Sequence, residues 1–154
     1  MAIFEGLDCA YGTYRVSGEP NAKGKSIGQA LVVRKPPTKD LWQRHFDGVD
    51  PSLGIIPIRA DNTCIWGCID IDQYPLDLAA LVAKIKKLKL PLVCCRSKSG
   101  GAHVFAFTKD PVPAGEMQDY LTGCAALIGE SGREIFPEQR EIPVSRGDTG
   151  NVQN

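Results

Sequence analysis

The sequence predicts an α+β fold, built mainly from antiparallel strand pairs with helices on the outer face. Short apolar runs alternate with turns that contain Gly, Pro, Asn or Asp, which is typical of strands. A segment at 76–88 instead carries its apolar residues at helical spacing. In chain order the elements are β-β-α-β-β-α-β-β-α-β, and 154 residues are enough for one domain with a substantial core.

Residues 1–52 are expected to form a small N-terminal αβ unit. Two strands are predicted at 11–17 and 27–34, on either side of a polar loop rich in Gly, Pro and Asn. Thr38 follows a proline pair and is suited to cap the N-terminus of a short helix that reaches about Phe46.

Residues 53–154 are expected to form a larger antiparallel unit. The strand-like segments 53–59 and 63–72 flank the turn 60–62, which predicts a hairpin. Hairpin, helix, hairpin, helix and strand in this order indicate an RRM-like sheet with helices on one face. The chain ends on a polar segment, so we expect this unit to be incomplete at its C-terminal end. The other predicted elements are helices at 76–88 and 114–128 and strands at 92–96, 102–107, 134–136 and 142–144.

Charge, cysteine spacing and apolar runs argue against a strongly basic nucleic-acid binder, a structural zinc protein and a membrane or secreted protein. Eighteen basic residues balance eighteen acidic ones, so nucleic acid could be attracted only by a local patch. The six cysteines include no Cys-x-x-Cys pair, which predicts reduced, buried thiols without structural zinc. No apolar run is long enough to span a bilayer, and the N-terminus lacks the pattern of a signal peptide. We therefore expect a cytoplasmic protein with no membrane partner.

Two carboxylates, Asp70 and Asp72, stand at the end of the apolar run 64–69. Because side chains alternate along a strand, both are expected on one face. Like charges on one face repel each other, and a divalent cation between them relieves the repulsion. Aspartates also cap turns such as 73–75, so the pair alone leaves both interpretations open.

A second polar cluster, residues 96–103, lies between two predicted strands. Its glycines would let backbone N–H groups approach phosphate oxygens, while hydroxyls and cationic side chains complete an anion site. The alternative is an ordinary hairpin loop with a structural histidine. Beside the aspartate pair, the first interpretation is favoured. The candidate phosphate ligands are Arg96, Ser97, Lys98, Ser99 and His103.

Chemistry with two metal ions needs a third carboxylate, because one pair rarely holds both ions. Glu134, in a short extended segment, is the best candidate. Glu138 and Asp148 are alternatives, but both fall in polar, turn-like stretches where exposure to solvent is expected.

These motifs together resemble the archaeo-eukaryotic primase superfamily, and most closely the primase-polymerase domains of phages, mobile elements and TOTE conflict systems. That family has an apolar strand ending in two acids, a serine-to-histidine motif on a neighbouring hairpin, and a third acid after a hydrophobic residue. The resemblance covers most of the chain but is thin before Thr38. The matching segments are 42–48, 53–58, 70–72, 96–105, 134–139 and 150–154.

The resemblance implies template-directed nucleotidyl transfer with NTP or dNTP. Asp70, Asp72 and Glu134 would hold two divalent ions, Mg²⁺ or Mn²⁺, and His103 would act beside them. It also implies a single-stranded or primed DNA template, helicase or accessory primase domains absent from this chain, and a bacterial or phage-infected host cell. Ser97, Lys98, Ser99 and His103 would bind the triphosphate, with Arg96, Asn151 and Arg146 as further contacts.

Three alternatives remain at this stage. A non-catalytic RRM-like module could stack bases on Phe105 and Phe107, which have strand spacing. A metal-dependent nuclease could use the same acidic pair. A catalytically incomplete domain could bind nucleotide only. His45, the other histidine, is interpreted as structural.

Overall fold

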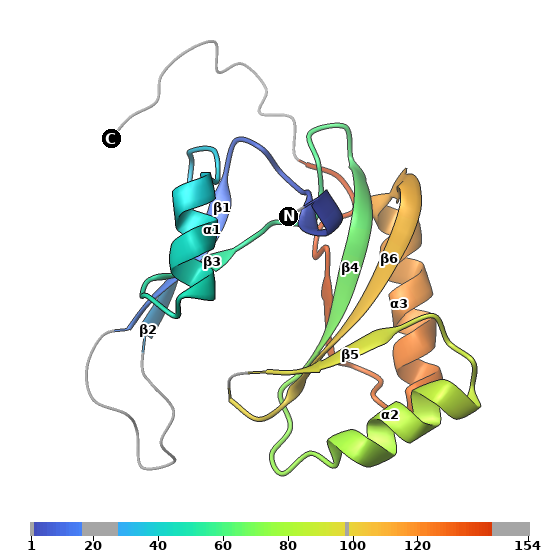
Figure 1. The fold of residues 1–154 in the computed structure, drawn as a ribbon. Helices are drawn as coiled ribbons and strands as arrows, with labels where there is room; N and C mark the ends of the chain where they lie inside the picture. Colours follow the sequence, from blue (N-terminus) through green and yellow to red (C-terminus); the bar gives the residue numbers. More distant parts are fainter. Residues whose placement is uncertain (1, 17–27, 98, 143–154) are drawn as a thin grey trace.

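The computed structural model describes residues 2–16, 28–97 and 99–142, which form two antiparallel sheets and three α-helices (Figure 1). A 3₁₀ turn at Ala2–Phe4 precedes the first strand. The helices are α1 (Lys39–Phe46), α2 (Leu78–Lys87) and α3 (Ala114–Ile128). The strands are β1 (Tyr11–Val16), β2 (Gly28–Val33), β3 (Ser52–Gly54), β4 (Thr63–Ile71), β5 (Val93–Arg96), β6 (Ala102–Pro113) and β7 (Glu134–Phe136).

The helices begin and end at the residues that local chemistry favours. Thr38 caps α1, because its hydroxyl accepts a hydrogen bond from the Leu41 N–H at 3.3 Å. Asp77 caps α2 in the same way, accepting from the Ala80 N–H at 2.9 Å. Helix α3 ends at Gly129, whose φ of 80° lies in the left-handed region that glycine adopts without strain. The expected α+β element order is thus confirmed within the described residues.

The smaller sheet has the strand order β2-β1-β3 and the larger one the order β5-β6-β4-β7. The predicted hairpin between 53–59 and 63–72 is wrong, since β3 pairs with β1 and not with β4. Both edges of β4 are already occupied, by β6 and β7, and no edge remains for a third strand. The turn itself does form, with the Arg59 N–H donating to the Thr63 carbonyl at 2.8 Å.

Two other predicted strands differ from the structure. The strand predicted at 102–107 continues as β6 to Pro113, and a register shift between Cys64 and Trp66 accommodates this extension. The strand predicted at 142–144 lies almost wholly outside the described residues, as do the expected polar C-terminal end and its motif at 150–154.

The hydrophobic core lies on one face of the four-stranded sheet. Ile69 and Ile71 of β4 are fully buried there, as is Val104 of β6. Helices α2 and α3 cover this face through residues such as Leu81 and Leu121. This is the arrangement predicted for the larger unit, with helices on one face of an antiparallel sheet.

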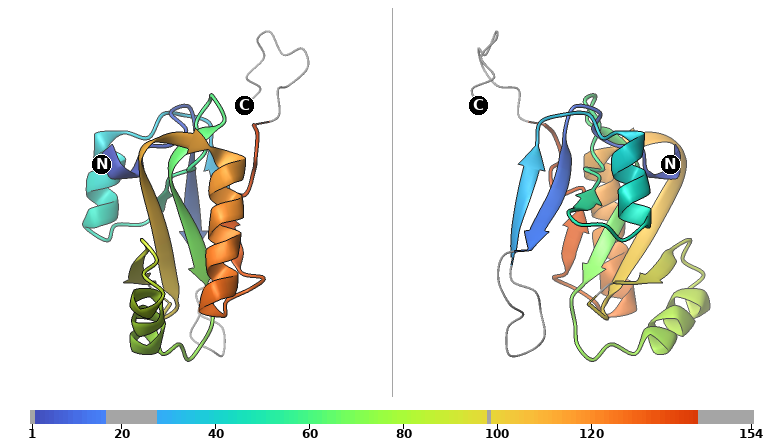
Figure 2. Two further views of the ribbon diagram at one scale, coloured as in Figure 1. Left: turned by 90° about the vertical axis from the view of Figure 1, so that its right-hand side faces the viewer. Right: turned by 60° about the vertical axis from the view of Figure 1, so that its left-hand side comes forward.

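The opposite face of the four-stranded sheet faces α1 and the smaller sheet. Figure 2 shows the four-stranded sheet between α3 on one side and the layer that contains α1 on the other. Because α2 and α3 occupy only one face, the alternate side chains of β4 and β6 remain available to line a site on the other. None of the helices in the described part of the chain is long and apolar enough to cross a membrane.

Gly67, in the middle of β4, provides a test of this packing. A Cβ there would lie 2.6 Å from Leu121 Cδ1 and 2.7 Å from the Phe136 carbonyl oxygen. We expect Gly67→Ala to lower the free energy of unfolding by about 2 kcal/mol, because the strand cannot move away from both neighbours.

Gly123 on α3 is the matched control, since nothing lies within 4 Å of a Cβ added there. Gly123→Ala should raise the free energy of unfolding by about 0.5–1 kcal/mol, because alanine favours the helix. Urea unfolding followed by circular dichroism measures both. Equal stability of the two variants would contradict the packing described for β4.

Candidate active site

One row of side chains crosses the four-stranded sheet at Asp70. Asp70 of β4 is the direct partner of His103 on β6 and of Glu134 on β7. Residues directly opposite in antiparallel strands project to the same face, with Cβ atoms about 5 Å apart. Three of the predicted site residues, from distant parts of the sequence, are therefore neighbours.

Asp70 and His103 interact directly. His103 Nε2 lies 3.5 Å from Asp70 Oδ1, and the two side chains are 43% and 24% exposed. The Phe105 ring packs edge-on against the imidazole, with ring centroids 6.0 Å apart. The imidazole is thereby held at the rim of the sheet face, between a carboxylate and an apolar ring.

Glu134 lies in a strongly acidic environment. A hydrogen bond with Glu138, partial burial and the charges of Glu138, Asp70 and Asp72 together raise the pKa of the Glu134 carboxyl. Glu138, the alternative to Glu134, is exposed to solvent as expected, and it also lies beside Glu134. Asp148, the other alternative, is outside the described residues.

The turn between β5 and β6 lies against the end of β4. The Ser97 N–H donates to the Gly101 carbonyl at 3.0 Å, and the Gly100 N–H donates to the Ser97 carbonyl at 3.0 Å. A Cβ on Gly101 would lie only 2.2 Å from the Ile71 carbonyl oxygen, and Gly100 has a φ of 96°. Gly101 is thus required for the close approach of this turn to the acidic strand, and Gly100 for the backbone conformation of the turn itself.

A chain of hydroxyl groups joins this turn to the second aspartate. The Tyr74 hydroxyl lies 2.7 Å from Asp72 Oδ1 and 2.6 Å from Ser99 Oγ. Ser99 Oγ lies 3.3 Å from Ser97 Oγ. Ser97 and Ser99, both predicted phosphate ligands, are therefore close to Asp72.

Among the described residues, one further predicted ligand, Arg96, does not join this group. Arg96 pairs with Ala102, whose side chain is buried in the core, so alternation directs Arg96 away from the face that carries His103. The position beside His103 is taken instead by Cys95, which sequence reasoning did not select. Lys98, Asn151 and Arg146 lie outside the described residues.

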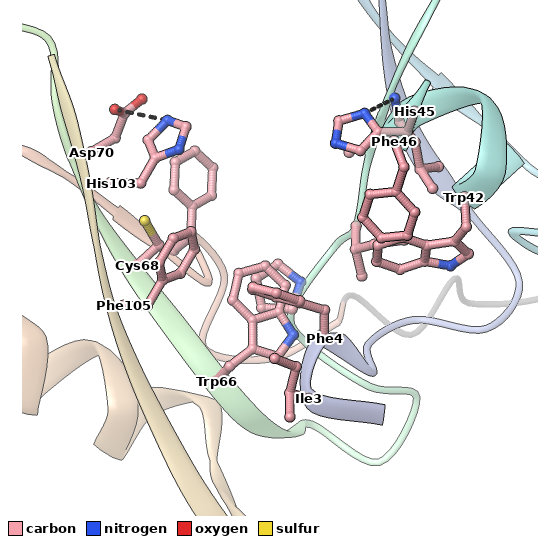
Figure 3. A pocket seen from close by; sticks show the side chains of 15 residues that line it. Ile3, Phe4, Trp42, His45, Phe46, Trp66, Cys68, Asp70, His103 and Phe105 are labelled. Atoms are coloured by element: carbon pink, nitrogen blue, oxygen red, sulfur yellow. Dashed lines mark hydrogen bonds and ion pairs between the residues drawn. The ribbon is translucent and has the colours of Figure 1, made fainter. Parts of the chain in front are cut away.

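A pocket of about 680 Å³ opens beside the row of site residues. Asp70, His103 and Phe105 form one wall, and Trp42, His45 and Phe46 of α1 form the opposite wall (Figure 3). His45 was expected to be structural. It does accept a hydrogen bond at Nδ1 from the Leu53 N–H, at 3.3 Å, but its ring also lines the pocket.

Phe4 of the N-terminal 3₁₀ turn covers the aromatic part of the sheet. Its ring packs edge-on against Trp66, Phe105 and Phe107, with centroid distances of 5.2, 5.4 and 5.4 Å. The Trp66 indole N–H donates to the Glu5 carbonyl at 2.9 Å and holds this turn in place. Phe4 therefore covers part of Phe105 and Phe107, the two rings on which an RRM-like binding module could stack bases, although Phe107 remains 37% exposed and Phe105 also lines the pocket.

The oxygen ligands available at this site suit a hard divalent cation. Asp70, Asp72 and Glu134 offer carboxylate oxygens, which Mg²⁺ and Mn²⁺ prefer. The hydrogen bond with Glu138 and partial burial are the main causes of the raised pKa of Glu134; the charges of Glu138, Asp70 and Asp72 add to it, and a cation would relieve the repulsion by the two aspartates. Within the described residues, however, no three His, Cys, Asp or Glu side chains converge closely enough to form a ready-made metal site.

The fold and this face define an α+β domain whose candidate site combines acidic side chains, a histidine and a hydroxyl-rich turn. The chain matches the family of the archaeo-eukaryotic primase domain of TOTE conflict systems over residues 17–152. It therefore belongs to that family, as its motifs predicted, and the family implies an activity of primase-polymerase type. A search of curated proteins found no match.

The interaction of Glu134 with Glu138 generates a prediction. We expect Glu138→Gln to lower the pKa of Glu134 toward its ordinary value, because the substitution replaces the carboxyl group that hydrogen-bonds to Glu134 and removes its charge. The pKa can be followed by NMR titration of the Glu134 side-chain carboxyl. Glu130→Gln, which changes a carboxylate that is paired with Arg133, is the control. An unchanged Glu134 titration in Glu138→Gln would contradict the pairing of the two carboxyl groups.

Proposed function

We propose that this domain catalyses template-directed nucleotidyl transfer, adding NTP or dNTP to a primer or a first nucleotide. The observation that carries the proposal is the row of Asp70, His103 and Glu134 across three strands, next to a turn rich in glycine and serine. Family membership supports the same type of reaction. We infer further that residues 53–154 act as an RRM-like catalytic unit, and residues 1–52 as a smaller αβ unit, of one domain.

Asp70, Asp72 and Glu134 are proposed to hold two divalent ions, Mg²⁺ or Mn²⁺. When bound, such ions favour deprotonation of the attacking 3′-hydroxyl and neutralise the charge of the triphosphate. The chain's own contribution is to hold the Asp70 and Glu134 carboxylates side by side on one face of the sheet, with Asp72 just beyond the end of β4, where cation binding would relieve their mutual repulsion. Asp70 is only 24% exposed, which limits competition from water.

The triphosphate is proposed to bind at the turn between β5 and β6. His103 stands beside Asp70, and the hydroxyls of Ser97 and Ser99 lie near Asp72, so the phosphate ligands adjoin the proposed metal ligands. Donors in fixed positions stabilise the charge that develops on the transferred phosphoryl group. Lys98 and Asn151, with Arg146, are proposed as further ligands from family resemblance alone, and Arg96 is a weaker candidate because of the face it occupies.

The pocket between α1 and the sheet is the proposed position of the nucleotide base. It has the size of a small-molecule site, and its walls carry the flat rings of Trp42, Phe46 and Phe105. It opens beside His103 and Asp70, so a nucleotide could place its base among the rings and its phosphates at the serine turn. A single-stranded or primed DNA template and accessory helicase or primase domains are the partners that this proposal implies. A cytoplasmic location is proposed with it.

Removal of the aspartate pair tests the proposal. We expect the double variant Asp70→Ala/Asp72→Ala to lose primer extension by several orders of magnitude, because the metal ions would lose two shared ligands. Calorimetry should show that Mn²⁺-dependent nucleotide binding is lost with it. The thermal midpoint should not fall, since the substitution removes a repelling pair.

The control for this experiment is Asp110→Ala/Glu116→Ala, which removes two exposed carboxylates outside the pocket. It should retain both extension and binding. Extension at the wild-type rate by the Asp70/Asp72 variant would overturn the site assignment. Binding of nucleotide by the wild type without any extension would favour the alternative of a catalytically incomplete nucleotide-binding domain, and cleavage of DNA would favour a nuclease.

His103→Ala should raise the KM for the nucleotide about 10- to 100-fold, because a hydrogen bond to a charged group contributes about 1.5–3 kcal/mol. Steady-state extension kinetics at saturating template measure this effect. Lys109→Ala, at an exposed position farther along β6, is the matched control and should leave KM unchanged. Unaltered KM and kcat in His103→Ala would remove His103 from the proposed phosphate ligands.

A further inference from the structure

Tyr74 connects two motifs that the proposed function assigns to different tasks. Its hydroxyl lies 2.7 Å from Asp72 Oδ1, on the acidic side, and 2.6 Å from Ser99 Oγ, on the phosphate side. Ser99 Oγ in turn lies 3.3 Å from Ser97 Oγ. Four oxygen atoms therefore form a continuous chain from the second aspartate to the turn between β5 and β6.

The single hydroxyl proton of Tyr74 faces two acceptors. The geometry places Tyr74 as the donor both to Asp72 Oδ1 and to Ser99 Oγ, and one proton can serve only one of them at a time. In the contact between Ser97 and Ser99, either hydroxyl can donate. A phosphate oxygen that hydrogen-bonds to the Ser99 hydroxyl therefore changes how the Tyr74 proton is divided between Ser99 and Asp72, and with it how strongly Tyr74 holds the Asp72 carboxylate.

The surroundings of Tyr74 favour a role in the site over a role in the core. The side chain is 47% exposed, and a Cβ built on Gly100 would lie 3.9 Å from its ring. The neighbouring Gln73 accepts a hydrogen bond from Arg133, the residue before β7. The loop 72–74 thus bridges the serine turn and the strand that begins with Glu134.

We propose that Tyr74 is a positioning residue that couples triphosphate binding at Ser97 and Ser99 to the orientation of the Asp72 carboxylate. The inference rests on the proposed function, since it assigns a nucleotide to the serine turn and a divalent cation to Asp72. It adds a mutual dependence: each ligand binds more tightly when the other is present, and the Tyr74 hydroxyl transmits part of that effect. Such coupling is reciprocal, so it can be measured from either ligand.

Tyr74→Phe removes the hydroxyl and keeps the exposed ring, so folding should be unaffected. The experiment measures the Kd for dATP by calorimetry, with Mn²⁺ and with a chelator in its place. For the wild type, Mn²⁺ should strengthen dATP binding. In Tyr74→Phe we expect this strengthening to fall about tenfold, within the usual range of coupling between two sites. The affinity measured in chelator should stay within about twofold of the wild-type value, since Ser97 and Ser99 remain.

Two further variants separate this coupling from simpler effects. Tyr120→Phe removes a tyrosine hydroxyl from α3, outside the candidate site, and should behave as wild type. Ser99→Ala should weaken dATP binding in Mn²⁺, and adding Tyr74→Phe to it should cause little further loss, because the two hydroxyls act through one chain.

The outcomes distinguish the inference from the function on which it rests. A Tyr74→Phe variant with the wild-type response to Mn²⁺ would overturn the coupling and leave the proposed function standing. Equal weakening with and without Mn²⁺ would also overturn it, since Tyr74 would then only contact nucleotide. A similar fall in the effect of Mn²⁺ on dATP binding in Tyr120→Phe would also overturn the coupling, because that hydroxyl lies outside the candidate site. Absence of dATP binding by the wild type under both conditions would overturn the inference and the proposed nucleotide site together.

Discussion

The central position of β4 is the constraint on which the rest of the structure depends. Both of its edges are hydrogen-bonded, to β6 and to β7, and one of its faces is buried under α2 and α3. Side-chain alternation then places Ile69 and Ile71 in the core and turns Asp70 to the other face. A shift of one residue in register would bury the carboxylate, so the hydrophobic core itself fixes where the acidic row lies.

Concentrating carboxylates on that face has an electrostatic cost. The raised pKa of Glu134 shows this cost. Its causes are the hydrogen bond with Glu138, partial burial, and the charges of Glu138, Asp70 and Asp72. The cost is limited because the row lies at the end of β4, where side chains remain partly exposed to water. The divalent cations proposed to bind at this face would relieve the same repulsion.

The two sheets contribute different parts of the candidate site. The four-stranded sheet supplies charge through Asp70, His103 and Glu134, whereas α1, beside the smaller sheet, supplies the rings of Trp42 and Phe46. Phe4 fills the aromatic end of the space between these layers and leaves the end beside His103 open. The pocket therefore combines a polar wall with an apolar one, which suits a ligand with a charged part and a flat part.

The sequence by itself determined the α+β class and the element order, because periodicity, turns and helix caps are local properties. It also showed the acidic pair at 70 and 72 and the serine-containing cluster at 96–103. Its motifs also indicated the family, which the match over residues 17–152 then confirmed. Only the tertiary structure decided that β3 pairs with β1, that Glu138 lies beside Glu134, and that Tyr74 joins Asp72 to Ser99. His45 and Phe46 likewise reach the pocket only through the packing of α1. These contacts join residues whose proximity depends on strand order and turn geometry, and no local pattern in the chain encodes either.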